Sequence, residues 1–205
     1  MKPRPTRGRW TIAPVGPDRW GDLENLLDRP GPHRGCWCLW WRVTHKAFGE
    51  MGEEGHKRRM RRIVRAGATP GLLGYLDGEP VAWVSLGPRT DFAALGASRL
   101  FRRVDGKPVL SVVCFVVRRD QRRQGWMRRL LRAAADYAAQ HGATLLEGYP
   151  VECGDRRLTG DSGYTGIAST FRAEGFREVA RPKADRPIMR RSLRRRDTGG
   201  PHGPA

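Results

Sequence analysis

The sequence predicts one α/β domain built on a mixed sheet. The chain has 205 residues, of which 39% are hydrophobic, which is enough for one sizeable core. Residues 109–151 read as strand, helix and strand, and shorter β-prone runs precede and follow them. We therefore expect the order β-α-α-β-β-β-α-β-α-β-β across residues 10–193.

The first part of this domain, residues 10–66, is expected to form one strand and two helices. "WTIAPV" is a short strand at an edge, because Pro14 cannot donate to a ladder. Apolar residues at helical spacing follow, and "RPGP" ends that helix after Asp28. A second helix is expected at about 46–66. Its apolar stripe consists of Phe48, Met51, Met60, Ile63 and Val64.

The middle of the chain is expected to supply the central strands. Two β-prone runs in 72–87 flank Asp77 and Gly78, a pair that tolerates the positive φ of a tight hairpin turn. A short helix should begin at Thr90 or the next residue. The continuous apolar run 109–117 is typical of a strand that is covered on both faces.

The last part should complete the sheet and its helical cover. A helix ends at His141 and Gly142, and its stripe is correctly spaced for an amphipathic helix. That stripe consists of Met127, Leu130, Leu131, Ala134 and Ala138. A strand at 143–151, a helix at about 165–174 and two short strands, "FREVA" and "PIMRRSL", follow.

The charge of the chain is strongly positive. Its formal net charge is +18, which predicts attraction to nucleic acid, anionic surfaces or phosphorylated ligands without choosing among them. Residues 1–9 are expected to be a flexible basic arm and 194–205 a disordered basic tail. No stretch reaches the roughly 18 apolar residues of a membrane helix, and no signal-peptide core follows the N-terminus, so we expect a cytoplasmic protein.

The turn "RRQGWM" follows the central strand directly. A buried strand that runs through a glycine turn into a helix is a natural anion site, because the first N–H groups of the helix are unpaired. Gly125 permits close backbone approach there. The turn lacks the three glycines of a dinucleotide fingerprint and the Gly-Lys-Ser/Thr of a P-loop.

Together with the helix, the next strand and the final "FRAEGF", this turn resembles the GNAT acyltransferase superfamily. The superfamily signature is Arg/Gln-x-x-Gly-x-Gly/Ala, and the resemblance covers about 72–193, with a compatible start at 10–66. It implies a mixed, mostly antiparallel central sheet and acetyl-CoA as co-substrate, without a metal. Residues 109–151 would be the acyl-CoA-binding unit, and 10–66 the substrate side.

The resemblance also assigns binding residues. It implies that the pyrophosphate of acyl-CoA binds backbone N–H groups of the turn, with charge-assisted bonds from Arg128. The turn residues are Arg122, Arg123, Gln124, Gly125, Trp126 and Met127. It further implies that the strand edge of Phe115, Val116 and Val117 pairs with the pantetheine arm. Met127 departs from the pattern, because the family prefers Gly or Ala there.

Two groups that the family uses for proton transfer are missing. The strand glutamate aligns with Ser111 and the helix tyrosine with Phe171. The loop after 143–151 offers acidic replacements, namely Glu152, Asp155 and Asp161. Glu152 is the preferred candidate base and Tyr164 the candidate donor to the leaving thiolate. Solvated loop acids and a packing tyrosine are the alternative reading.

The segment "HRGCWCLWWR" has the most unusual composition of the chain. Its tryptophans could line the acceptor channel, or they could belong to the core. These tryptophans are Trp37, Trp40 and Trp41. His33, Cys36, Cys38 and His45 include zinc-ligand types, but the C-x-C spacing is tighter than usual and we expect no metal. Cys114 lies inside the central strand with no base beside it in sequence.

Three functions remain open on the sequence. The first is N-acetyl transfer from acetyl-CoA to a primary amine of a small molecule or polypeptide, by a monomer or homodimer. The second is a basic nucleic-acid-binding module, whose affinity would fall steeply with salt. The third is a non-catalytic acyl-CoA-binding protein of the same fold. The buried strand that leads into Gly125 favours the first over the second.

Overall fold

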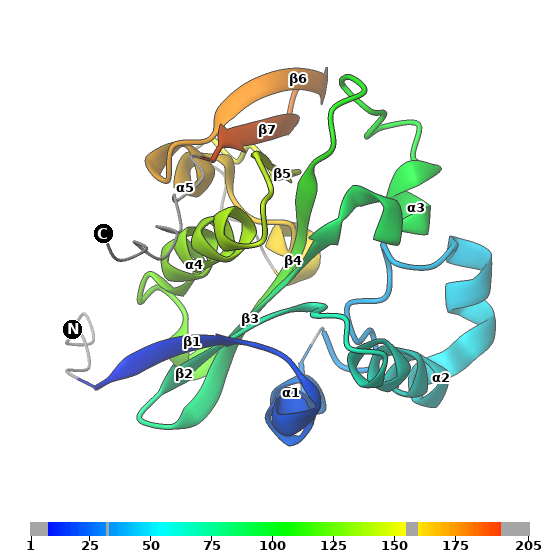
Figure 1. The fold of residues 1–205 in the computed structure, drawn as a ribbon, viewed down its shortest axis with the longest axis vertical. Helices are drawn as coiled ribbons and strands as arrows, with labels where there is room; N and C mark the ends of the chain where they lie inside the picture. Colours follow the sequence, from blue (N-terminus) through cyan, green and yellow to red (C-terminus); the bar gives the residue numbers. More distant parts are fainter. Residues whose placement is uncertain (1–7, 32, 155–159, 194–205) are drawn as a thin grey trace, which may run out of the picture.

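A computed structural model describes residues 8–31, 33–154 and 160–193 of the chain. In these residues the strands form one seven-stranded sheet in the order β1-β2-β3-β4-β5-β7-β6 (Figure 1). Its neighbours are antiparallel except for the parallel pair β4 and β5, which confirms the mixed α/β sheet. The strands are β1 (Trp10–Pro14), β2 (Gly71–Leu76), β3 (Glu79–Pro88), β4 (Leu110–Val117), β5 (Leu145–Gly148), β6 (Arg177–Lys183) and β7 (Arg186–Ser192).

The helices follow the predicted order. They are α1 (Trp20–Leu27), α2 (His45–Arg65), α3 (Ala93–Gly96), α4 (Trp126–Gln140) and α5 (Ala168–Ala173). Inside α2 the chain kinks at Gly52, where φ is 62°. The last helix is shorter than the expected 165–174, because Gly166 has φ 98° and Ile167 forms a bridge with Val151. Most of the arm 1–9 and the whole tail 194–205 lie outside the described residues.

Two apolar clusters pack on the two faces of the sheet. On one face Leu23 of α1 and Met60 of α2 pack with Trp83 of β3. On the other face Leu130 of α4 and Phe171 of α5 pack with the strand residues whose side chains point to that face. Successive residues of a strand point to opposite faces, so the central strands are covered on both sides, as their continuous apolar sequence predicts.

The sheet opens between β4 and β5. The parallel pairing joins Leu110 and Val112 of β4 to Leu146 and Gly148 of β5. There β5 ends, whereas β4 continues to Val117. The register of β4 against β3 shifts between Val112 and Cys114, as in a β-bulge, which turns the strand locally. The result is a fork whose open side is the edge of the second half of β4.

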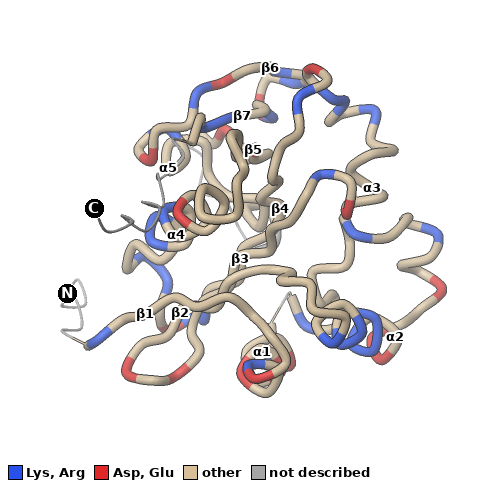
Figure 2. The backbone as a smooth tube through the Cα atoms, in the orientation of Figure 1, with Lys and Arg blue, Asp and Glu red and all other residues tan. Residues whose placement is uncertain are grey.

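Charged residues are spread over the surface. Figure 2 shows Lys and Arg on both α2 and α4, the helices that cover opposite faces of the sheet. The positive charge is therefore not gathered into one track along a single element. Within the described residues, none of the helices combines the length and apolar character needed to span a bilayer.

Candidate functional site

A cavity of about 840 Å³ lies beside the fork. Its walls come from four parts of the chain: the end of β4, the turn before α4, the segment 33–40 and the segment 163–170. The turn contributes charged residues to the lining, and Phe115 and Trp40 contribute apolar surface from other walls. A long ligand with an anionic end and a thinner apolar arm would match this shape and polarity.

The turn before α4 has the backbone geometry of an anion-binding site, and we call this turn the cradle. Arg123 and Gly125 both take left-handed conformations, with φ of 63° and 79°. Gly125 is the N-cap of α4, and it has no side chain to satisfy the first N–H groups of the helix. These N–H groups carry the positive end of the helix dipole, and Gly125 and Met127 both line the cavity. The cradle therefore offers backbone donors to a phosphate.

The structure brings most of the predicted binding residues together. The cavity is lined by Phe115, Val116, Val117, Arg122, Arg123, Gly125, Trp126, Met127 and Arg128. Gln124 is not among its lining residues, and its side-chain amide donates to the carbonyl of Asp120 at 3.2 Å. The Arg128 side chain is already ion-paired within the protein, because its Nε lies 2.8 Å from a carboxylate oxygen of Glu174.

Met127 does not block the turn. Its side chain is half-buried and packs against the apolar cluster under α4. The indole of Trp126 is buried beneath the turn, where it packs so closely on Gly74 that a Cβ there would lie 2.8 Å from the ring. The family's Gly or Ala is thus replaced by a side chain that packs partly against this cluster and also lines the cavity.

The open edge of β4 is partly occupied. The backbone N–H of Phe115 donates to the carbonyl oxygen of Tyr164 at 2.7 Å. This N–H was expected to pair with a pantetheine arm. A ligand that pairs here has to displace Tyr164 or use the neighbouring groups of the strand.

Tyr164 lines the cavity with its half-buried side chain. Burial raises the pKa of its phenol to about 12. The hydroxyl therefore keeps its proton throughout the neutral range and can act as a donor to a leaving group.

Glu152 is placed differently. It is not among the cavity-lining residues, and its carboxylate is ion-paired with Arg172 and lies 3.4 Å from Nη2 of Arg181. The hydrogen bond from Arg172 is the main cause that lowers the pKa of Glu152. Such a carboxylate is a weak base. Asp155 lies outside the described residues, and the side chain of Asp161 is likewise not described.

His33 is a cavity residue that sequence reasoning considered only as a metal ligand. Its Nε2 is buried and has no hydrogen-bond partner among the described residues. Burial lowers the pKa of His33, and the cation of Arg122 lowers it further, against a hydrogen bond to the Leu26 backbone. His33 is therefore neutral at pH 7, and among the described residues its buried Nε2 has no partner. The sequence gives no signal for this, because the burial and the Arg122 cation that lower the pKa of His33 arise only in the folded chain.

The three tryptophans divide between cavity and core. Trp40 lines the cavity and stacks on His45, with ring centroids 4.2 Å apart. Trp37 is 1% exposed and stacks on Trp20 at 5.4 Å, and Trp41 is buried against Phe101. An aromatic wall is thus formed by Trp40, while the other two pack in the core. In the described part of the chain, His, Cys, Asp and Glu form no cluster of three or more suited to a metal.

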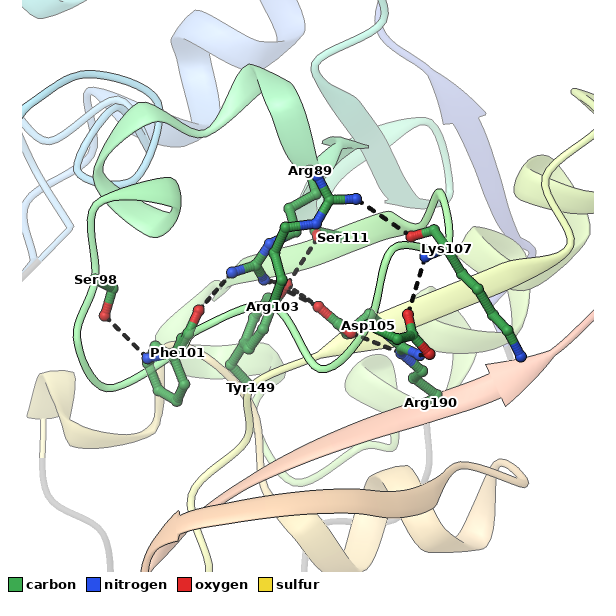
Figure 3. Close-up of polar contacts among 10 residues, drawn as sticks. Arg89, Ser98, Phe101, Arg103, Asp105, Lys107, Ser111, Tyr149 and Arg190 are labelled. Carbon is green, nitrogen blue, oxygen red and sulfur yellow. Dashed lines mark hydrogen bonds and ion pairs between the residues drawn. The ribbon is translucent and has the colours of Figure 1, made fainter.

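A buried ionic network joins β5 to β4 at the base of the fork (Figure 3). Glu147 is 1% exposed and accepts hydrogen bonds from Arg89 at 3.0 Å, from Arg190 at 2.7 Å and from the hydroxyl of Tyr149 at 2.5 Å. The Tyr149 oxygen lies 2.9 Å from Oγ of Ser111. Both guanidinium groups neutralise one carboxylate, so the network holds the two strands where they begin to separate.

The two positions that align with the family's proton-transfer groups are both buried. Ser111 is fully buried and is engaged with Tyr149 rather than with the cavity. Phe171 is also fully buried and packs edge-on against Phe115 and Phe176. Neither position offers a titratable group to a ligand.

The sequence of residues 20–152 matches the family described as the acetyltransferase (GNAT) family. The chain belongs to this family, whose fold and activity together support transfer of an acetyl group from coenzyme A in general. Among curated proteins none matches the sequence.

Solved structures have the same fold. The PaiA N-acetyltransferase of Thermoplasma acidophilum, crystallised with coenzyme A, superposes with a TM-score of 0.50 at 10% identity, over 90% of this chain and 99% of that one. PH1933 of Pyrococcus horikoshii gives 0.53 at 13% identity, over 91% and 99%. A putative GNAT acetyltransferase of Desulfovibrio desulfuricans gives 0.51 at 14% identity, over 90% and 99%.

Proposed function

We propose that this protein transfers an acetyl group from acetyl-CoA directly to a primary amine of a small molecule or polypeptide. One observation carries the proposal: the cavity joins an uncapped helix N-terminus to the open edge of β4. The cradle at Gly125 would hold the pyrophosphate, and the walls formed by Phe115 and Val117 would hold the pantetheine arm. The acceptor would enter past Trp40, whose ring also suits a cation.

Two side chains of the cavity would carry out the proton transfers, one from the amine and one to the leaving sulfur. An amine of the lysine type has a pKa of about 10.4, so it must lose a proton in the reaction at pH 7. His33 Nε2 would accept that proton as the C–N bond forms, and Tyr164 would donate its proton to the sulfur as the C–S bond breaks. Glu152, held by Arg172 and outside the cavity lining, would not act as the base.

Gly125→Ala tests the cradle. Left-handed backbone costs a residue with a Cβ about 1 to 2 kcal/mol, and relaxation of that strain should turn the helix N–H groups away from the phosphate. We expect the Kd for acetyl-CoA, measured by calorimetry, to rise about tenfold.

Gly142→Ala is the matched control. Gly142 stands at the other end of α4 with φ 77°, and a Cβ at either glycine would meet nothing within 4 Å. Both variants should lose similar stability, and only Gly125→Ala should lose affinity. Wild-type protein without measurable binding of acetyl-CoA would contradict the proposed function.

Tyr164→Phe tests the acid. A thiol with a pKa of about 8.5 leaves readily as thiolate, so we expect a modest fall in kcat, of about tenfold, with KM for acetyl-CoA unchanged. Release of free thiol with a panel of amines measures it. Because the pKa of Tyr164 is about 12, the wild type should show no loss of activity from this group between pH 7 and 10. Equal kcat in the variant and the wild type would remove Tyr164 from the mechanism.

A further inference from the structure

Two cysteines from distant parts of the chain meet at the cavity. The Sγ atoms of Cys38 and Cys114 lie 3.2 Å apart, although 76 positions separate them in sequence. Both residues are buried and both line the cavity. Cys38 belongs to the segment 33–40, and Cys114 lies on β4 beside its bulge.

The surroundings of the pair make the two thiols unequal in acidity. The hydrogen bond with Cys114 lowers the pKa of Cys38, burial opposes that shift, and the Trp83 side chain and the nearby cation of Arg42 lower the pKa further. Hydrogen bonding to Cys38 and burial raise the pKa of Cys114, which keeps its proton. A more acidic thiol in contact with a second thiol that keeps its proton is the arrangement of a nucleophilic cysteine with a resolving partner.

We propose that Cys38 and Cys114 form a reversible oxidation site, in which a peroxide converts the two thiols into an intramolecular disulfide. The observations behind this are the sulfur contact and its place on the cavity wall, which small oxidants can reach. The sulfurs need to approach by only about 1.2 Å to reach the bond length of about 2.0 Å.

The chemistry balances with hydrogen peroxide as the oxidant. The Cys38 sulfur attacks one peroxide oxygen and the O–O bond breaks, which gives a sulfenic acid and releases the other oxygen as water. The Cys114 sulfur then attacks the Cys38 sulfur and displaces the second oxygen, which leaves as water with the Cys114 proton. In sum, two thiols and one hydrogen peroxide give one disulfide and two waters, and a dithiol reductant reverses the oxidation.

Oxidation should close the acyl site. A disulfide would tie the segment 33–40 to β4 in the cavity wall, next to Phe115 on the open edge, and would fix the wall in a geometry that the reduced site does not have. We expect acetyl transfer to fall at least tenfold and to return after treatment with dithiothreitol. This consequence rests on the proposed function, whereas formation of the disulfide does not.

Mass spectrometry of folded, full-length protein tests the site. After treatment with hydrogen peroxide, the intact mass should fall by two hydrogen atoms. Tryptic peptides 35–42 and 104–118 should then run as one cross-linked species that dithiothreitol separates. No cross-link, or a sulfinic acid at Cys38 without a cross-link, would overturn the proposal.

Cys36 requires its own control, because it shares the peptide 35–42 with Cys38 and also lines the cavity. Burial is the main cause that raises the pKa of Cys36 to about 11, so it is a poor nucleophile. Cys36→Ser should still cross-link, whereas Cys38→Ser and Cys114→Ser should not. A cross-link that is lost in Cys36→Ser and kept in Cys38→Ser would assign the chemistry to Cys36 and contradict us.

The activity measurement separates the two proposals. Cys153 is not among the cavity-lining residues, so Cys153→Ser should show both the loss with peroxide and its reversal. If a cross-link forms but no amine accepts an acetyl group, the oxidation site stands and the proposed function fails. If a variant folds poorly, fragmentation of the wild-type cross-link still identifies the joined sulfurs.

Discussion

Glu147→Gln should lower the free energy of unfolding by about 3 to 5 kcal/mol, the cost of breaking a buried ion pair from one side. The carboxylate is 1% exposed and Arg89, its partner, is 7% exposed. The substitution keeps the shape of the side chain but leaves Arg89 and Arg190 without their shared counter-charge. Urea unfolding followed by tryptophan fluorescence should show a lower midpoint with an unchanged slope.

Glu178→Gln is the control for this result. Glu178 pairs with Arg181 on the surface, where both side chains are about one-third exposed. Exposed pairs contribute at most about 1 kcal/mol, so the control should unfold almost as the wild type does. If Glu147→Gln lowers the free energy of unfolding by less than 1 kcal/mol, water reaches the network. The network then does not hold β4 and β5 together at the base of the fork.

His33→Gln should lower kcat for acetyl transfer by about 100-fold at pH 7, at the lower end of what general base catalysis contributes. Glutamine occupies similar space and keeps a polar group at the cavity, but it cannot accept a proton. The Kd for acetyl-CoA should be unchanged. His141→Gln, at the exposed end of α4, serves as the control and should keep wild-type activity.

The pH profile gives a second readout for His33. The base works only when its ring is neutral, and the pKa of His33 is lowered below 6.5. The wild type should therefore keep its activity at pH 7 and lose it as the pH falls below 6.5, as the ring takes up a proton. His33→Gln should lack that acid limb. A variant with the wild-type kcat and the same acid limb would exclude His33 as the base.

Local patterns in the chain were sufficient for the architecture. The run 109–117 predicted a strand covered on both faces, and the stripe of Leu130 and Leu131 predicted the helix that packs there. Gly125 predicted the turn, because few other residues accept its φ of 79°. These features depend on residues that are close in sequence, so a single sequence contains the information for them.

The chemistry of the cavity was not predictable in this way. Glu152 was a reasonable candidate until Arg172, twenty positions later, was found against it. His33 and Trp40 reach the cavity through contacts of the whole segment between α1 and α2, and neither Trp37 nor Trp41 does so. Nothing in the local pattern distinguishes these tryptophans, because all three have the same type of side chain in one short segment.

The sequence by itself determined the order of the strands and helices and the glycine turn of the cradle, since short-range periodicity and backbone conformation decide them. The tertiary structure alone decided which groups can react. It paired Cys38 with Cys114, placed Glu147 between Arg89 and Arg190, and left Nε2 of His33 with no partner in the described part of the chain. The physical reason is that pKa and reactivity depend on burial and on neighbours within a few ångströms, and here those neighbours come from distant parts of the chain.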